Sequence, residues 1–300
     1  MNKLEKFTES YNFNDYEEIL DQIIETINYG VNILIQNKPM FKAEDFIYYN
    51  YDEYYLGTNN NTYNPINFYV CLNKKENINH VDSKYKKTIA PALHFELNKF
   101  KEEFFNILVG LFDETYQLSK DKYGINISNE IFMKENGFPG IKFYIVPCVS
   151  YVNKNGVEGV MFYTNNRKFI DVNYPELSVK NFVKKDEETN YLLSTYIKLF
   201  KNIYMKFYEL EDLPFDMFEV LFYNVPTELY EDLSFDNARK ILEYLLNKNI
   251  KDYSTIDEQD LQFNSKYKSL SRLYAKRVIK TLLKLVSNPD HKIFDNDNLQ

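Results

Sequence analysis

Lysine side chains that could bind an anion gather in the second half of the chain. Lys198 and Lys201 are three residues apart in a stretch whose apolar residues have helical spacing, so they share one face of the expected helix. Together with Lys185 they could hold an anionic ligand as flexible point charges. The alternative is that the lysines of this region only solvate a helix surface. These lysines are Lys184, Lys185, Lys198, Lys201 and Lys206.

Histidine and cysteine, the other residue types suited to catalysis or metal binding, show no such arrangement. His80, His94 and His291 have neither a nucleophile nor a metal-ligand pattern around them, which indicates structural roles. Cys71 and Cys148 lack metal-ligand spacing and lie in apolar, strand-like runs. We therefore expect them to be buried thiols in a reducing compartment.

Composition and charge narrow the class of protein. The chain has 300 residues, enough for one large core or two modest ones, and its 27 Tyr and 24 Phe against 8 Gly are typical of an AT-rich genome. A net charge of −8 argues against broad electrostatic capture of nucleic acid, although it leaves room for a local basic groove. No apolar run reaches the roughly 18 residues of a membrane helix, and no signal-peptide core follows the N-terminus. We expect a cytoplasmic protein without a membrane partner.

The apolar periodicity predicts an α+β lobe in the first part of the chain. It contains two helices and four strands, with a turn at residues 153–156 between two of the strands. The expected helices are residues 14–36 and 91–118, and the expected strands are 66–72, 141–152, 157–163 and 168–172.

Beyond residue 175 the pattern is helical. We expect a domain boundary within residues 172–180, which divides the chain into an α+β core (1–175), a helical lobe (176–288) and a frayed tail (289–300). The expected helices of the second lobe are residues 187–207, 215–223, 236–246 and 266–285.

The segment DLPFDMFEVLFYNVP, residues 212–226, combines a turn, an aromatic amphipathic helix and a proline stop. Pro214 fits the first turn of that helix and Pro226 ends it. From its apolar face alone it is a core helix. Its amino-acid sequence also resembles an element of bacterial nucleotidyltransferases of the DNA polymerase β superfamily. This group contains cyclic-oligonucleotide synthases and oligoadenylate-synthase-like enzymes.

Further phrases resemble this family in the same order along the chain. They are FYIVPC (143–148), NYP (173–175), Lys185 with Thr189, and Lys198 with Lys201. The resemblance implies a polymerase β-like nucleotidyltransferase core, a helical second lobe and a cleft between the lobes. It also implies a nucleotide site, in which a phosphate lies at a glycine turn and Tyr191 either stacks on a base or belongs to the core. The residues that it assigns to this site are Gly57, Thr58, Lys185, Thr189, Tyr191, Lys198 and Lys201.

The catalytic carboxylates of that family are missing at the aligned positions. Phosphoryl transfer of this type uses two divalent ions about 4 Å apart, held by an Asp-x-Asp pair on one strand and a third Asp on its neighbour. Here the pair reads Pro65 and Asn67, and the third position is Tyr144. Neither a neutral amide nor a phenol balances a dication as a carboxylate does. No convincing substitute pair lies on a strand; the carboxylates considered are Asp45, Asp52, Asp171, Asp290, Asp295 and Asp297.

These observations leave three functions open. The first is a pseudoenzyme that keeps the fold without bound metals and binds a nucleotide or an active protein partner. The second is an active nucleotidyltransferase, using Mg²⁺ or Mn²⁺ with a nucleoside triphosphate, that makes an oligonucleotide signal or tails RNA. The third is a protein-interaction module with an aromatic surface.

Overall fold

The computed structural model shows two compact units. It describes residues 3–8, 14–37, 46–50, 66–72, 83–121, 124–129, 142–153, 155–163, 170–208, 217–259 and 269–294. The α+β unit takes its described residues from 14–50 and 66–176, and the helical unit takes them from 3–8 and 177–294. No helix among these residues is long and apolar enough to cross a membrane.

A mixed sheet forms the centre of the α+β unit. Its strands follow the order β1-β2-β5-β4-β3, with β6 added beside β5 and β7 beside β6. Strands β2 and β5 run parallel, and the other pairs are antiparallel. The strands are β1 (Phe46–Asn50), β2 (Ile66–Leu72), β3 (Gln117–Lys120), β4 (Ile125–Ser128), β5 (Lys142–Val152), β6 (Glu158–Tyr163) and β7 (Ile170–Asn173).

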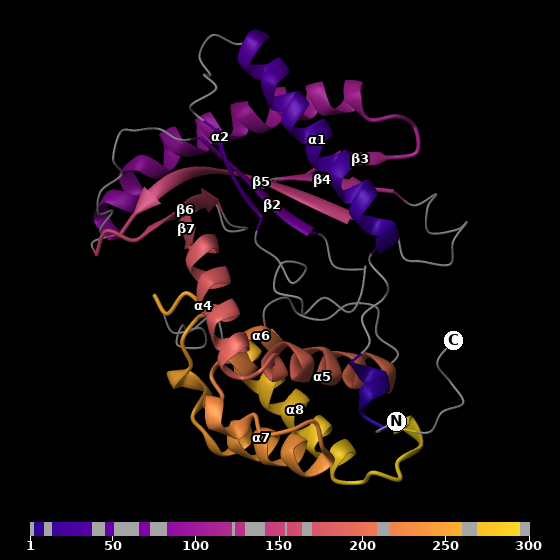
Figure 1. Ribbon diagram of the computed structural model, residues 1–300. Helices are drawn as coiled ribbons and strands as arrows, with labels where there is room; N and C mark the ends of the chain where they lie inside the picture. Colours follow the sequence, from indigo (N-terminus) through magenta and orange to yellow (C-terminus); the bar gives the residue numbers. More distant parts are fainter. Residues whose placement is uncertain are drawn as a thin grey trace. The chain divides into compact units, whose positions relative to one another are not determined.

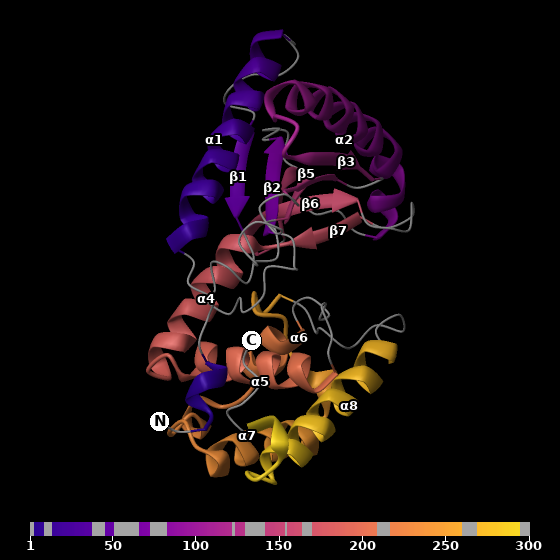
Figure 2. The same ribbon diagram turned by 90° about the vertical axis from the view of Figure 1, so that its right-hand side faces the viewer.

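Two long helices, α1 (Asn14–Asn37) and α2 (Ser83–Leu111), cover one face of this sheet (Figures 1 and 2). They pack closely because Gly30 lets the backbone of α1 approach Phe104 and Leu108 of α2. Ile27 on α1 and both of these α2 residues are fully buried. Successive side chains of a strand point to opposite faces, so every second residue of β2 and β5 points to the other face of the sheet.

Local sequence patterns predicted some elements of the α+β unit correctly and missed others. The helix expected at residues 14–36 and the strand at 66–72 are confirmed. The helix expected at 91–118 is shifted, since α2 begins eight residues earlier and ends at Leu111. The Asp113 carboxylate accepts hydrogen bonds from Thr115 N and Oγ1, which forms a turn that ends the helix. Strands β1, β3 and β4 were not predicted.

The helical unit is built from α4 (Pro175–Glu188), α5 (Leu192–Tyr208), α6 (Met217–Tyr223), α7 (Phe235–Asn247) and α8 (Ser269–Val286). Sequence periodicity predicted one helix over residues 187–207 and missed α4. The chain instead turns between α4 and α5, where Asn190 and Tyr191 have φ angles of 52° and 64°. Two successive left-handed residues cannot continue a right-handed helix.

The helical unit also contains the N-terminal turn Glu5–Phe7, although residues 1–175 were expected to form one domain. The Phe7 ring meets the edge of Phe294 with centroids 5.8 Å apart, and Asn202 Nδ2 donates to the Phe7 carbonyl at 2.7 Å. Phe294 lies in the expected frayed tail, yet it is only 1% exposed. Burial of both rings holds the two ends of the chain in this unit.

Candidate functional site

The positions aligned with the missing carboxylates meet in the sheet. Asn67 on β2 is the register partner of Tyr144 on the parallel strand β5. Register partners point to the same face, and alternation places Tyr69 two residues further along that face. The fold thus brings together the two positions, Asn67 and Tyr144, at which the resemblance implies carboxylates.

A carboxylate that the sequence analysis did not consider, Asp121, lies beside Tyr144. The Tyr144 hydroxyl donates to Asp121 Oδ1 at 2.9 Å, and Gly124 N donates to the same oxygen at 2.8 Å. Lys101 Nζ, on α2, donates to the Asp121 carbonyl at 2.6 Å. Asp121 follows β3 directly and Gly124 precedes β4, so an Asp-to-Gly turn signal could have predicted this hairpin.

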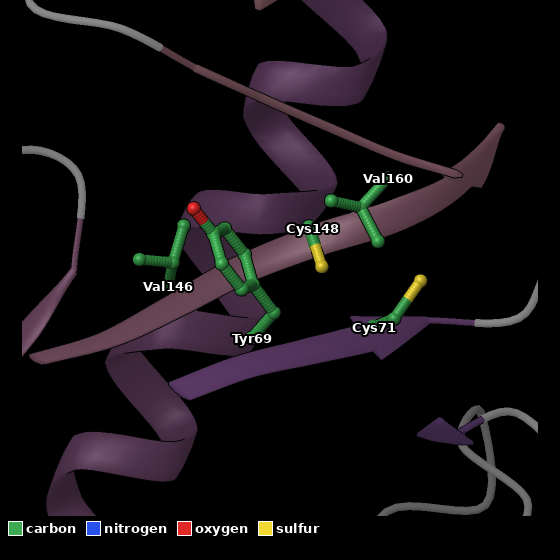
Figure 3. Packing of buried hydrophobic residues seen from close by; sticks show 5 residues of the cluster. All are labelled: Tyr69, Cys71, Val146, Cys148 and Val160. Atoms are coloured by element: carbon green, nitrogen blue, oxygen red, sulfur yellow. The ribbon is translucent and has the colours of Figure 1, made fainter. Parts of the chain in front are cut away.

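An apolar cluster occupies much of this face (Figure 3). Tyr69, Cys71, Val146, Cys148 and Val160 form a buried cluster against which the Tyr144 ring packs. Cys71 and Cys148 are register partners on β2 and β5. Both cysteines are thiols outside any disulfide and are fully buried, which confirms the expected buried thiols.

Burial shapes the proton chemistry of the two thiols. It raises the pKa of the Cys148 thiol well above its ordinary value. A hydrogen bond from Cys148 is the main cause that lowers the pKa of Cys71, and Ser150 Oγ lies 3.4 Å from Cys71 Sγ. The pair therefore belongs to an apolar interior and adds no carboxylate to the site.

The donors at this face do not fit a pair of divalent ions. Asn67 offers a neutral amide, Tyr144 a phenol, and Asp121 one carboxylate that already accepts two hydrogen bonds. Mg²⁺ and Mn²⁺ prefer several anionic oxygens. Within the described residues no group of three or more His, Cys, Asp or Glu side chains could hold a metal ion.

Asp171 and Asp290 are the other carboxylates considered from the sequence that lie among the described residues. Asp171 is on β7, opposite Phe162 of β6. Asp290 is in the helical unit with a side chain that is 95% exposed. Nine residues named from the sequence lie outside the described residues: Asp45, Asp52, Gly57, Thr58, Pro65, His80, Pro214, Asp295 and Asp297.

Two of the predicted nucleotide-binding residues, Thr189 and Tyr191, lie in the turn between α4 and α5. Asp186 Oδ1 accepts from Ser194 N at 2.8 Å, and Thr189 Oγ1 accepts from Leu193 N at 3.1 Å. Both side chains therefore cap the N-terminus of α5. Thr189 is only 2% exposed, and its hydroxyl also donates to the Asp186 carbonyl at 2.9 Å.

Tyr191 differs from its neighbours because its ring is 63% exposed. Its positive φ of 64° is uncommon for a bulky residue and costs backbone strain. The hydrogen bond from Tyr191 N to the Asp186 carbonyl, at 2.7 Å, holds this conformation. The turn thus presents an aromatic surface at the start of α5.

The three predicted lysines have different environments. Lys185 Nζ donates to the Tyr223 carbonyl at 2.5 Å and lies over the Tyr223 ring, while Lys201 forms a buried ion pair with Glu219. Lys198 is half-buried, and burial lowers its pKa while Asp186 opposes that shift. Burial likewise lowers the pKa of Lys185. Anion binding by Lys201 would require its ion pair to open.

No protein-family model and no curated protein matches this chain. Its fold, however, matches the nucleotidyltransferase fold of several solved structures. This confirms the α+β fold class expected from the sequence.

Particular solved structures with this fold are bacterial synthases. The chain is similar to the CdnE c-UMP-AMP synthase of Rhodothermus marinus, with a TM-score of 0.73 and 18% identity over 99% of this chain and 98% of that one. The CdnE cyclic dinucleotide synthase of Elizabethkingia meningoseptica is similar with a TM-score of 0.63 and 15% identity, over 89% of this chain and 91% of that one. For CdnC of E. coli MS115-1 the TM-score is 0.57 and the identity 11%, over 97% of this chain and 90% of that one. Similarity at such identities establishes a shared fold.

Proposed function

We propose that this protein is a catalytically inactive nucleotidyltransferase-fold protein that binds a nucleotide or an active protein partner. The observation that carries the proposal is the register pairing of Asn67 with Tyr144. This pairing places an amide and a phenol where two neighbouring strands would have to supply carboxylates.

The hydrogen bonds of Asp121 support inactivity. Asp121 Oδ1 already accepts hydrogen bonds from Tyr144 OH and Gly124 N, so an ion that bound this oxygen would compete with both donors. The buried cluster beyond Tyr144 supplies only thiols and a phenol as polar groups. Without metal-dependent chemistry, the function proposed for the fold is to bind a nucleotide or a protein partner.

The turn between α4 and α5 is the proposed nucleotide-binding surface. An exposed ring such as that of Tyr191 can stack on a base, which contributes about 1–3 kcal/mol in single-stranded nucleic-acid complexes. Lys198 could neutralise phosphate charge on the same helix. The E. coli CdnC structure contains ATP and the Rhodothermus CdnE structure contains nucleotide analogues.

Calorimetry and an activity assay test this proposal together. The full chain is titrated with ATP, GTP and UTP, with and without Mg²⁺, and incubated with radiolabelled triphosphates in Mg²⁺ or Mn²⁺. We expect metal-independent binding and no labelled product. Tyr191→Asn, which removes the ring but tolerates positive φ, should weaken binding, whereas Lys184→Gln on exposed α4 should not. Metal-dependent product from the wild-type chain would overturn inactivity.

An active nucleotidyltransferase is the second candidate, and the position of Asp121 beside Tyr144 favours it. In that case the wild-type chain forms product, and Asp121→Asn abolishes product formation while leaving nucleotide binding in place. If neither product nor nucleotide binding is detected, an active protein partner remains as the ligand. A neighbour, E. coli CdnC, has been solved with a HORMA protein, so pull-down with a purified partner is the corresponding test.

A further inference from the structure

The basic residues of this acidic chain are unevenly distributed. Residues 261–289 contain seven Lys or Arg and no Asp or Glu, although the whole chain carries a net charge of −8. The described part of this segment forms helix α8 and the residues after it. Positive charge is therefore concentrated on one element of the helical unit.

Helix α8 separates its apolar and basic residues onto opposite sides. The buried side packs against α7 and α5 and consists of Ala275, Val278, Ile279, Leu282, Leu285 and Val286.

At 100° per residue, the exposed positions between residues 272 and 286 fall within an arc of about 100°. Four of these five positions are basic: Lys276, Arg277, Lys280 and Lys284, beside Leu273. A rise of 1.5 Å per residue places the four charges along about 12 Å of helix. We call these four residues the α8 basic face.

Within the described residues, none of the four side chains of the α8 basic face forms an ion pair or a side-chain hydrogen bond. Helix α7 of the same unit provides a contrast. There Arg239 pairs with Asp236 at 2.9 Å and Lys240 pairs with Glu231 at 3.0 Å. The usual pairing of exposed charges on a helix surface is thus absent from α8.

We propose that the α8 basic face binds the phosphate backbone of a nucleic acid. A row of unpaired cations matches a ligand whose negative charges repeat at short intervals along a line. Such binding reads charge and not base sequence, because no set of side chains for base-edge recognition accompanies the row. The net charge of −8 excludes broad capture by the whole surface but not this local contact.

A membrane surface fits the helix less well. Helices that lie in a membrane interface insert an apolar face, whereas the apolar face of α8 is buried inside the helical unit. Leu273, 69% exposed, is the large apolar residue on the outer side. The inference is independent of the nucleotide site proposed above, since it requires neither turnover nor binding at Tyr191.

The test measures binding of fluorescein-labelled 40-base-pair DNA and RNA duplexes to the full chain by anisotropy, between about 50 and 200 mM salt. With four phosphate contacts, Kd should rise roughly 100-fold over this range. The triple variant Lys276→Gln/Lys280→Gln/Lys284→Gln should lose most of that affinity and about three units of salt slope. The matched control, Lys240→Gln/Lys248→Gln/Lys251→Gln, removes the same charge from exposed sites of the same unit and should bind as the wild type does.

Three results would overturn the proposal. The first is no duplex binding at 50 mM salt, and the second is an equal loss of affinity in both triple variants. The third is binding to vesicles containing phosphatidylserine together with failure to bind either duplex. Circular dichroism of each variant confirms folding, which these exposed substitutions should preserve.

Discussion

Phenol, amide and thiol groups occupy the face of β2 and β5 on which the fold family's chemistry would need carboxylates. Tyr144 illustrates the consequence, because its ring packs on the apolar cluster while its hydroxyl donates to Asp121. A carboxylate at position 144 would stand beside the Asp121 carboxylate and repel it in the absence of a cation. The residues of this face stabilise one another without an ion.

Tyr196 offers a pH-dependent prediction at the residue scale. Its ring is fully buried and its hydroxyl donates to the Asp232 carbonyl at 2.5 Å. Burial is the main cause that raises its pKa from 10.0 to about 12. The folded protein therefore holds this proton between pH 10 and 12 while the unfolded chain releases it, so the free energy of unfolding falls as pH rises through that window.

We expect Tyr196→Phe to flatten this decline. At neutral pH the variant should lose about 1 kcal/mol with the hydrogen bond. The measurement is urea unfolding at pH values from 8 to 11.5, with Tyr29→Phe, at a 58% exposed ring, as the control. An unchanged slope in Tyr196→Phe would show that this hydroxyl does not contribute to alkaline unfolding.

At the scale of elements, close contacts between neighbouring strands and helices hold the site residues in place. The β3–β4 hairpin approaches β5 at Gly124, and α5 and α6 are joined by the buried pair of Lys201 and Glu219. The hairpin contact places Asp121 beside Tyr144. The buried pair explains why Lys201 differs from Lys198 although both lie on α5.

Substitution of Gly124 tests the hairpin contact. A Cβ at this position would lie 2.4 Å from the Ile145 carbonyl oxygen and 2.7 Å from Tyr144 Cζ. We expect Gly124→Ala to lower the free energy of unfolding by about 1–3 kcal/mol, because the strand cannot move away without losing its pairing. In the control, Gly110→Ala, the new Cβ meets nothing within 4 Å in a helix and should stabilise by about 0.5–1 kcal/mol. Equal effects of the two changes would contradict the crowding.

Replacing the buried ion pair tests the contact between α5 and α6. Lys201→Met removes the cation from a Glu219 side chain that is 2% exposed, which should cost about 3–5 kcal/mol. The double variant Lys201→Met/Glu219→Met should recover most of this loss, since no isolated charge then remains buried. Thermal and urea unfolding measure both, and Lys240→Met, which breaks an exposed pair, should change the free energy of unfolding far less than Lys201→Met does. A double variant no more stable than the single would count against a desolvated pair.

At the scale of the whole molecule, the helical unit depends on residues from both ends of the sequence. The Phe7 ring packs against Phe294, and the Phe7 carbonyl oxygen accepts a hydrogen bond from Asn202 Nδ2. Lys6 Nζ also donates to the Phe294 carbonyl at 2.6 Å. The α+β unit, in contrast, takes its described residues from the chain between these ends.

Phe7→Ala should therefore destabilise a unit whose remaining described residues begin at Leu177, about 170 positions later. Phe7 is 2% exposed, and removal of its ring should cost about 3–5 kcal/mol. Urea unfolding followed by circular dichroism measures the loss, with Phe95→Ala, at a 69% exposed ring, as the control. If both variants match the wild type, the N-terminal turn contributes no stability to the helical unit.

Much of the element pattern follows from the sequence alone. Helix α1 and strand β2 are confirmed because their periodicity is contained in neighbouring residues. The ordered motifs, from FYIVPC to the α6 segment, also sufficed to predict the nucleotidyltransferase fold that the solved structures confirm. The pairing of Asn67 with Tyr144 was implied by alignment and is now seen as strand register.

Only the tertiary structure decided which side chains meet. It placed Asp121 against Tyr144, buried Lys201 with Glu219 while leaving Lys198 half-buried, and turned the chain at Tyr191. As far as the described residues show, it also left the four residues of the α8 basic face exposed and without ion pairs. Local periodicity reports which face of an element is apolar, but strand register, helix packing and desolvation depend on partners distant in the sequence, and these long-range contacts determine the chemistry of each group.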